Sequence, residues 1–287
     1  MRRGCRLCVA RYAGQPGTGG CLGHLDGMRL FEARCGLDGA RYGPVGYATG
    51  HRLVLPRSGA YLMRINGREV FVDSGAALLI RAGDEMRVAH PLGGGDTFTD
   101  VILDAEIADR WPRSAYRFPL DDATDLDHRL LIATCRREFD ALAAGERLQS
   151  LLDRLAPHAA WRGSGSPATA VAHRRLATEA REVLAEGRYA DGLAGIAARV
   201  NCSPHHLSRI FRSVTGETLT AYRNRMRVRA VLSDVQDGAD CLRTLAARYG
   251  FADQSHLTRV VRKHLGRPPN AVVRILRSST DVQRRDA

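Results

Sequence analysis

The sequence lacks the long apolar segments that mark membrane and secreted proteins. None of its apolar runs reaches the roughly 18 residues that a membrane-spanning helix needs. Arg2 and Arg3 stand near the start of the chain, but Gly4 and Arg6 interrupt the apolar stretch that a secretory signal requires. We therefore expect a cytoplasmic protein with no membrane partner.

Motifs of enzymes are also missing. The sequence contains no G-x-S-x-G element of the kind that presents a nucleophilic serine. The glycines at 93–95, followed by Asp96, do not link a strand to a helix as a phosphate-binding loop does, and they indicate a turn instead. We therefore expect no catalytic residues and no cofactor.

Cysteines are few, and their number is odd. Seven thiols in a chain of 287 residues fit the reduced state better than a disulfide framework. Cys5-x-x-Cys8 and the later Cys21-x-x-His24 have the spacing of a zinc site. No strand or helix pattern supports these four side chains. A dispensable N-terminal arm is the favoured interpretation, zinc binding is left open, and we assign no metal site.

Positive charge is concentrated in the C-terminal part of the chain. Over the whole sequence 43 basic residues exceed 31 acidic ones by 12, and residues 168–287 account for 10 of that excess. Every basic residue but Lys263 is an arginine. A basic region of this kind favours a polyanionic partner such as nucleic acid.

The N-terminal half indicates short strands. Residues 1–30 are rich in glycine and have no helical or strand period, so we expect a disordered arm there. From Val45 to Leu103 apolar runs of about five residues alternate with turn residues, which is typical of a small sandwich or barrel. Asn66-Gly67 between two such runs predicts a hairpin with a type I′ turn.

Beyond Pro119 the apolar period becomes helical. Two stripes fall on helix faces: Leu131, Cys135, Phe139 and Leu142, and then Leu148, Leu151, Leu152 and Leu155. These stripes either pack on the β region or form a dimer seam. Residues 161–167 contain glycine, serine and Pro167 and predict a linker, and everything beyond it has a helical pattern.

The strongest feature is an internal repeat in the basic part. Residues 196–216 align with residues 245–266, with one extra residue in the second turn. Each copy predicts a helix, a tight turn and a second helix. Ser203 before Pro204, and Asp253 in the second copy, are suited to cap the second helices, which Gly216 and Gly266 end.

The outer faces of these second helices are polar and basic. Arginine can pair with guanine edges and glutamine with adenine, whereas serine and threonine are less selective. The faces carry His205, Ser208, Arg209 and Arg212 in the first copy, and Gln254, Ser255, Thr258, Arg259, Arg262 and Lys263 in the second. Arg212, Arg262 and Lys263 lie a turn further on and are suited to DNA phosphates.

A single helical pattern joins the two copies. It runs from Leu219 to about Leu232, contains four arginines, and predicts a rod of roughly 20 Å. Such a rod could hold two reading helices about one turn of DNA apart, near 34 Å. The sequence therefore predicts a monomer that contacts two successive major grooves of double-stranded DNA.

These residues resemble the AraC/XylS family of bacterial transcription regulators. The resemblance covers about 175–277 and is carried by the paired units, by the A-x-x-G-F run from Ala247 to Phe251, by the Ser-Pro start of the first reading helix, and by the terminal glycine followed by proline. Family members usually have aromatic residues where Leu257 and Val261 stand, and a Tyr-Arg pair at Val272 and Val273. Because the residues present here keep the core apolar, the departure concerns packing detail.

The resemblance implies an α+β protein of two domains. A cupin-like β-barrel that binds an effector or dimerises would precede an all-α domain with two helix-turn-helix units, and RNA polymerase would be a partner. The implied base-reading residues are His205, Ser208, Arg209, Gln254, Ser255, Thr258 and Arg259. The implied domains are a cupin-like region over 31–118, helices over 119–160, the linker, a DNA-binding domain over 168–278 and a tail over 279–287.

Two alternatives concern the predicted barrel. A metal-dependent cupin enzyme fused to a DNA-binding domain would need clustered ligands, yet His51 and His90 have no H-x-H pair or suitably spaced glutamate. A constitutive homodimer could use the barrel for contact alone. If a small-molecule pocket exists there, Tyr61, Arg64 and His90 are its candidate lining residues.

Overall fold

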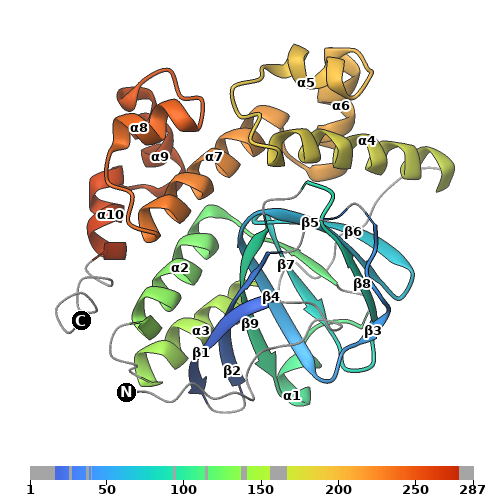
Figure 1. Cartoon of the computed structure of the whole chain (residues 1–287), viewed down its shortest axis with the longest axis vertical. Helices are drawn as coiled ribbons and strands as arrows, with labels where there is room; N and C mark the ends of the chain where they lie inside the picture. Colours follow the sequence, from blue (N-terminus) through green and yellow to red (C-terminus); the bar gives the residue numbers. More distant parts are fainter. Residues whose placement is uncertain are drawn as a thin grey trace. The chain divides into compact units, whose positions relative to one another are not determined.

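The structure is a computed structural model that describes residues 17–25, 28–36, 39, 41–92, 95–113, 116–136, 141–155 and 167–277. The chain divides into two compact units, residues 1–160 with 274–287, and residues 161–273. Below, the β region means the described residues from 17 to 155, and the helical region means residues 167–277 (Figure 1). Among the described helices, none is both long and apolar enough to cross a membrane.

Ten strands make up the sheets of the β region. They are β1 (Gly17–Leu25), β2 (Met28–Cys35), β3 (Gly46–Tyr47), β4 (His51–Ser58), β5 (Ala60–Ile65), β6 (Arg68–Asp73), β7 (Ala76–Ile80), β8 (Glu85–Ala89), β9 (Asp96–Leu103) and β10 (Arg117–Pro119). One antiparallel sheet has the order β1-β2-β9-β4-β7-β10 and the other the order β3-β8-β5-β6. The predicted β-barrel is therefore corrected to two separate sheets: no described strand pairs with members of both, as closure of a barrel would require. The cupin-like character of this region stays a prediction.

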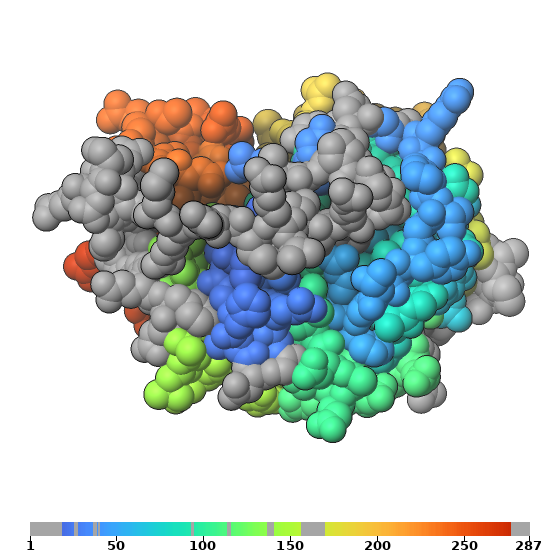
Figure 2. All heavy atoms as spheres, turned by 60° about the horizontal axis from the view of Figure 1, so that its bottom comes forward, coloured from blue at the N-terminus to red at the C-terminus, as the bar shows by residue number. Residues whose placement is uncertain are grey.

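The six-stranded sheet is covered on both faces. Leu53 and Leu55 of β4 pack on one side against α2 (Asp122–Arg136) and α3 (Ala141–Leu155). Val54, between them, faces Tyr61 and other core residues of the smaller sheet. Because both faces are buried, β7 and residues 53–56 in the middle of β4 have continuous apolar sequences instead of alternating ones. Exposed side chains of the β region form much of the face in Figure 2, in blue to green.

The predicted hairpin at Asn66-Gly67 is confirmed. Ile65 pairs with Arg68, so two residues connect β5 to β6. Both have positive φ, 47° at Asn66 and 76° at Gly67, as a type I′ turn requires.

The expectation of a disordered arm over 1–30 is wrong where the structure describes that segment. Residues 17–25 form β1, which pairs with β2. Gly19 is closely packed there, because a Cβ at this position would lie 2.5 Å from the carbonyl oxygen of Glu32, whereas Gly20 has open space beside it. Residues 1–16, which include Cys5 and Cys8, lie outside the described residues.

The helical stripes pack on the larger sheet, with one exception. Leu131, Cys135 and the leucines 148, 151, 152 and 155 all join its core. Leu142 does not, because its side chain is 73% exposed on α3, and Phe139 lies outside the described residues. A short helix, α1 (Ala105–Ala108), follows β9.

The helical region consists of seven helices. They are α4 (Pro167–Ala185), α5 (Leu193–Arg199), α6 (Pro204–Thr215), α7 (Leu219–Gln236), α8 (Leu242–Arg248), α9 (Gln254–Leu265) and α10 (Pro269–Arg277). The start of α7 shares a core with α4, α5 and α6. Helix α7 continues about one turn beyond the predicted end near Leu232. Residues 161–166 of the predicted linker lie outside the described residues, and the proposed domain boundaries stay predictions.

Candidate nucleic-acid interface

Both repeats fold as a helix, a turn and a second helix, as predicted. Helices α5 and α6 form the first unit, and α8 and α9 the second. At the starts of α6 and α9, the side chain of Ser203 accepts a hydrogen bond from the His206 amide, and that of Asp253 accepts one from the His256 amide. We call α6 and α9 the reading helices. Their starts are fixed by these caps.

The remaining predicted features of the repeat are also present. Gly216 and Gly266 end the reading helices in the left-handed conformation, with φ of 82° and 68°. Ala197 and Ala246 are buried where the helices of each unit cross. Leu257 and Val261 are fully buried as well, so the departures from the family pattern leave the core apolar.

The predicted DNA-contacting side chains lie on the outer faces of the reading helices. His205, Arg209 and Arg212 of α6 are exposed, and Ser208 is half-buried. On α9, Gln254, Ser255, Arg259, Arg262 and Lys263 are exposed, and Thr258 is half-buried. Neither reading helix contains an acidic residue. The two faces can therefore approach a phosphate backbone without repulsion, although contact by each side chain stays a prediction.

Local contacts distinguish individual side chains on these faces. The Thr258 hydroxyl donates to the Gln254 carbonyl oxygen at 2.9 Å, so its methyl group and lone pairs remain for a base. The His256 ring accepts a hydrogen bond from the Ala252 amide at 3.2 Å and packs on Phe251. His256 thus stabilises the turn before α9.

The arginines of α7 are directed into the protein. Arg223 donates to the Asp191 carbonyl oxygen at 2.7 Å, and Arg225 pairs with Glu217. Arg227 and Arg229 are buried. Much of the positive charge that the sequence places on this helix therefore holds the helical region together and does not form a DNA-binding face.

Arg227 connects the two helix-turn-helix units. Its guanidinium donates to the carbonyl oxygen of Tyr189, which precedes α5, and lies 5.2 Å from the ring centroid of Phe251 in the second turn. Tyr189 also packs edge-on against Tyr249, with ring centroids 5.7 Å apart. Burial, and after it the charge of Arg223, lower the pKa of Arg227 to about 10, although Tyr189 acts in the opposite direction. The side chain stays charged near neutral pH.

The same joint explains the glycine in the second turn. Gly250 has φ of 68°, and a Cβ there would lie 2.9 Å from the Ala190 amide nitrogen and 3.1 Å from Nη2 of Arg227. In the first turn, Asn201 occupies the equivalent left-handed position with φ of 51°. Sequence reasoning identified both turns but not this contact, which becomes visible only when the two copies are placed together.

The candidate effector residues are only partly brought together. Tyr61 and His90 are buried, and their ring centroids lie 5.6 Å apart. Arg64 was predicted beside them, but it is on the opposite face of β5, where it pairs with Glu69 and stacks on Tyr42. The strand alternation puts positions 61, 63 and 65 inside and position 64 outside.

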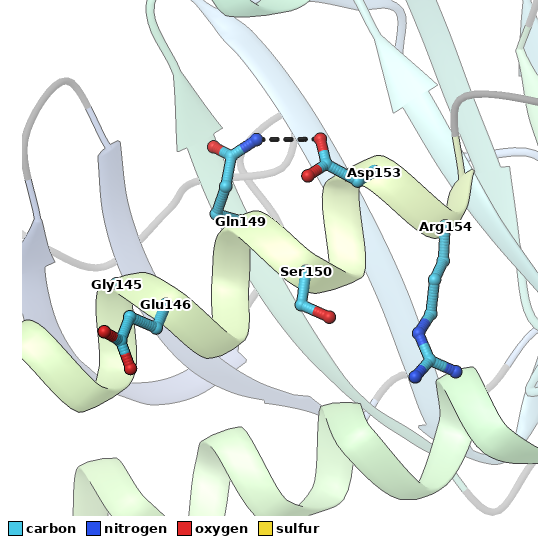
Figure 3. A pocket seen from close by; sticks show the side chains of 6 residues that line it. All are labelled: Gly145, Glu146, Gln149, Ser150, Asp153 and Arg154. Carbon is cyan, nitrogen blue, oxygen red and sulfur yellow. Dashed lines mark hydrogen bonds between the residues drawn. The ribbon is translucent and has the colours of Figure 1, made fainter.

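A surface pocket lies elsewhere, on α3. Figure 3 shows its lining residues, all from this one helix, with Gln149 donating to Asp153 at 2.8 Å. Arg154 of the same pocket pairs with Asp127 of α2. None of the candidate effector residues lines this pocket, so it does not support the predicted effector site.

The described half of the suspected zinc motif is in β1. Cys21 Sγ and His24 Nδ1 lie 3.8 Å apart. Since Cys5 and Cys8 are outside the described residues, zinc binding by all four stays open.

Comparison with known proteins identifies the repeat region. Residues 196–275 match the family model described as a helix-turn-helix domain. The multiple antibiotic resistance protein MarA of Escherichia coli is 30% identical over 78 residues, 27% of this chain and 61% of MarA. The protein named "Probable transcription factor PqrA" of Proteus vulgaris is 32% identical over 74 residues, 26% of this chain and 61% of PqrA. The chain thus spans less than two thirds of these relatives.

Two solved structures align with lower similarity. The DNA-binding domain of AdpA, in complex with a target DNA, is 25% identical with a TM-score of 0.33, over 39% of this chain and 97% of that one. ToxT from Vibrio cholerae is 9% identical with a TM-score of 0.34, over 87% of this chain and 98% of its own.

Proposed function

We propose that the chain is a sequence-specific DNA-binding transcription regulator of the AraC/XylS type, because residues 196–275 match a helix-turn-helix family model and form two such units. One observation carries the proposal. Two capped helices of twelve residues each, α6 and α9, expose polar and basic faces without any acidic side chain. Helices with such faces can read base edges in the major groove and contact phosphates at its rim.

The proposal assigns two roles to the exposed side chains. Base edges are read by His205, Ser208, Arg209, Gln254, Ser255, Thr258 and Arg259, and phosphates are bound by Arg212, Arg262 and Lys263. Because phosphate contacts release counterions, the affinity falls steeply with salt, whereas discrimination between sequences depends on the first set.

The β region is proposed to be a cupin-like regulatory domain that responds to a small-molecule effector or to a partner. The support is that two facing sheets form a compact unit separate from the helix-turn-helix units, with Tyr61 and His90 in contact inside it. A homodimer contact and a contact with RNA polymerase stay predictions. Action on DNA would place the chain in the cytoplasm.

The alternative of a metal-dependent cupin enzyme gains no support from the matches. The family model and the curated relatives align with the helix-turn-helix region. Metal content alone would not make the β region an enzyme, so the alternative requires a demonstrated reaction.

Selection of bound genomic fragments by the full chain tests the proposal. We expect a shared sequence in the bound fragments and a loss of preference for it in the double variant Arg209→Ala/Arg259→Ala. Arg175→Ala is the matched control, because this arginine is 81% exposed, belongs to α4 and not to a reading helix, and pairs with Glu179. Absence of a preferred sequence, or equal losses in the double variant and the control, would contradict the proposal.

A further inference from the structure

Three side chains with metal-ligating atoms meet at one end of the space between the two sheets. Cys35 ends β2 and Asp96 begins β9, and the strand register pairs these two residues directly. His90 follows β8 of the other sheet. The ligand atoms of the three residues, one sulfur, one nitrogen and one oxygen, all lie within 4.8 Å of one another.

His90 and Asp96 are buried and Cys35 is half-buried, and the backbone holds the cluster in place. His90 and Asp96 are each 4% exposed, and His90 Nε2 lies 2.9 Å from Asp96 Oδ1. Two backbone hydrogen bonds between His90 and Gly39, of 2.8 and 3.2 Å, fix the histidine. A Cβ at Gly59 would lie 2.7 Å from the Asp96 Cα, so only glycine allows this close approach. The three side chains are therefore presented from backbone segments that are already fixed.

We propose that Cys35, His90 and Asp96 bind a divalent transition-metal ion of the zinc class. Zinc bonds of ~2.0–2.3 Å place tetrahedral ligand atoms roughly 3–4 Å apart, which these side chains reach by small rotations. Thiolate and imidazole select zinc-class ions over magnesium and calcium, which prefer oxygen ligands. The ion would take the place of the hydrogen bond between His90 Nε2 and Asp96 Oδ1.

Three protein ligands leave a fourth coordination position open. Structural zinc sites usually have four protein ligands, whereas an open position holds water or a small ligand. The site is thus suited to sense the ion or a molecule that coordinates it. Metal binding itself is independent of DNA binding, and only its use as a regulatory signal rests on the proposed function.

Equilibrium dialysis of the metal-free full chain against zinc chloride, followed by metal analysis, tests the site. We expect about one zinc ion per chain, and a fall in affinity of at least ~10-fold in Cys35→Ser and in His90→Ala. Cys21→Ser is the matched control, because Cys21 belongs to the other candidate motif. Cobalt should bind with a thiolate charge-transfer band, and loss of this band in Cys35→Ser would identify Cys35 as a ligand. Zinc lost in Cys21→Ser but kept in Cys35→Ser would overturn the proposal.

A second measurement needs no variant and so does not depend on the folding of one. Alkylation of the unaltered chain by iodoacetamide, followed by peptide mass analysis, reports each thiol. Zinc should slow the modification of Cys35 by at least ~10-fold and leave the exposed Cys241 unaffected. Equal rates at Cys35 with and without zinc would refute the site. DNA binding, measured on the same metal-free protein, distinguishes this failure from failure of the proposed function.

Discussion

The two helix-turn-helix units share one scaffold but differ in what they expose and in how their turns pack. Both have a side-chain cap, a left-handed residue in the turn and a left-handed glycine at the end of the reading helix. The last turn of α9 contains three basic residues, Arg262, Lys263 and His264, whereas the last turn of α6 contains one basic residue, Arg212. The two units thus share their apolar positions and helix caps, whereas the exposed faces of their reading helices differ.

The turns differ because only the second one forms the joint between the units. Gly250 faces Ala190 and Arg227 closely, whereas Asn201 carries a side chain at the equivalent position. The second unit is therefore expected to contribute more to both phosphate binding and the rigidity of the pair. Each of the following predictions tests one side of this asymmetry.

The largest expected effect is that of Gly250→Ala. Positive φ and the close Ala190 backbone should reduce the free energy of unfolding by about 2–3 kcal/mol. Asn201→Ala should reduce the free energy of unfolding by about 1 kcal/mol, because an alanine there is disfavoured only by the left-handed backbone conformation. Urea unfolding followed by helical circular dichroism measures both. Equal losses would remove the distinction between the turns.

The next effect concerns base reading. Arg259→Ala should weaken binding to the selected sequence by about 1–3 kcal/mol and relax preference at particular base pairs, with a smaller change on random DNA. Arg209→Ala should relax preference at different base pairs, because α6 and α9 would read separate segments. Binding titrations on a set of single-base variants of the selected site measure both. Equal losses on specific and random DNA would contradict the assignment of Arg259.

The caps should contribute about 1 kcal/mol each to stability. Ser203→Ala and Asp253→Ala remove the hydrogen bonds to the His206 and His256 amides. The loss should be somewhat larger for Asp253→Ala at low salt, because a carboxylate also interacts favourably with the helix N-terminus. Asp253→Asn keeps the hydrogen bond and isolates this charge effect. Thermal unfolding at low and high salt provides the measurement, and a larger loss for Ser203→Ala at low salt would count against it.

The smallest effect is expected at a single phosphate contact. Arg262→Ala should weaken binding to all sequences alike and reduce the slope of log affinity against log salt by about 1. Arg212→Ala should have the same effect in the first helix-turn-helix unit. In the second unit, the double variant Arg262→Ala/Lys263→Ala should reduce the slope more than Arg212→Ala does. Affinities over a salt series test this. A sequence-dependent loss in Arg262→Ala would reassign the residue to base reading.

Features that depend on neighbouring residues were predictable from the sequence. The caps at Ser203 and Asp253, the terminal glycines and the Asn66-Gly67 hairpin each involve contacts within a few residues, so their patterns are visible in the chain. The buried leucine stripe of α3 followed from helical period alone, although period could not show that Leu142, at its start, is exposed.

Features that depend on contacts between distant parts of the chain could not be predicted from the sequence. The meeting of Cys35 with Asp96 follows from strand register, and search for a histidine pair could not reveal it. The glycine-rich sequence of β1 indicated disorder, because its pairing with β2, where Gly19 lies against the backbone of Glu32, was not visible in the chain. Likewise, the sequence shows Arg227 only as one of four arginines in a helical pattern. Its buried contacts with Tyr189 and Phe251 are visible only in the structure.

The Arg227 joint also limits which operators the protein could use. Two recognition elements that are clamped together cannot slide independently along a duplex. Each base pair inserted between their two contacted segments moves the second segment by about 3.4 Å and rotates it by roughly a tenth of a turn. An operator for such a pair would accept substitutions in its uncontacted spacer but would fail when that spacer gains or loses a single base pair.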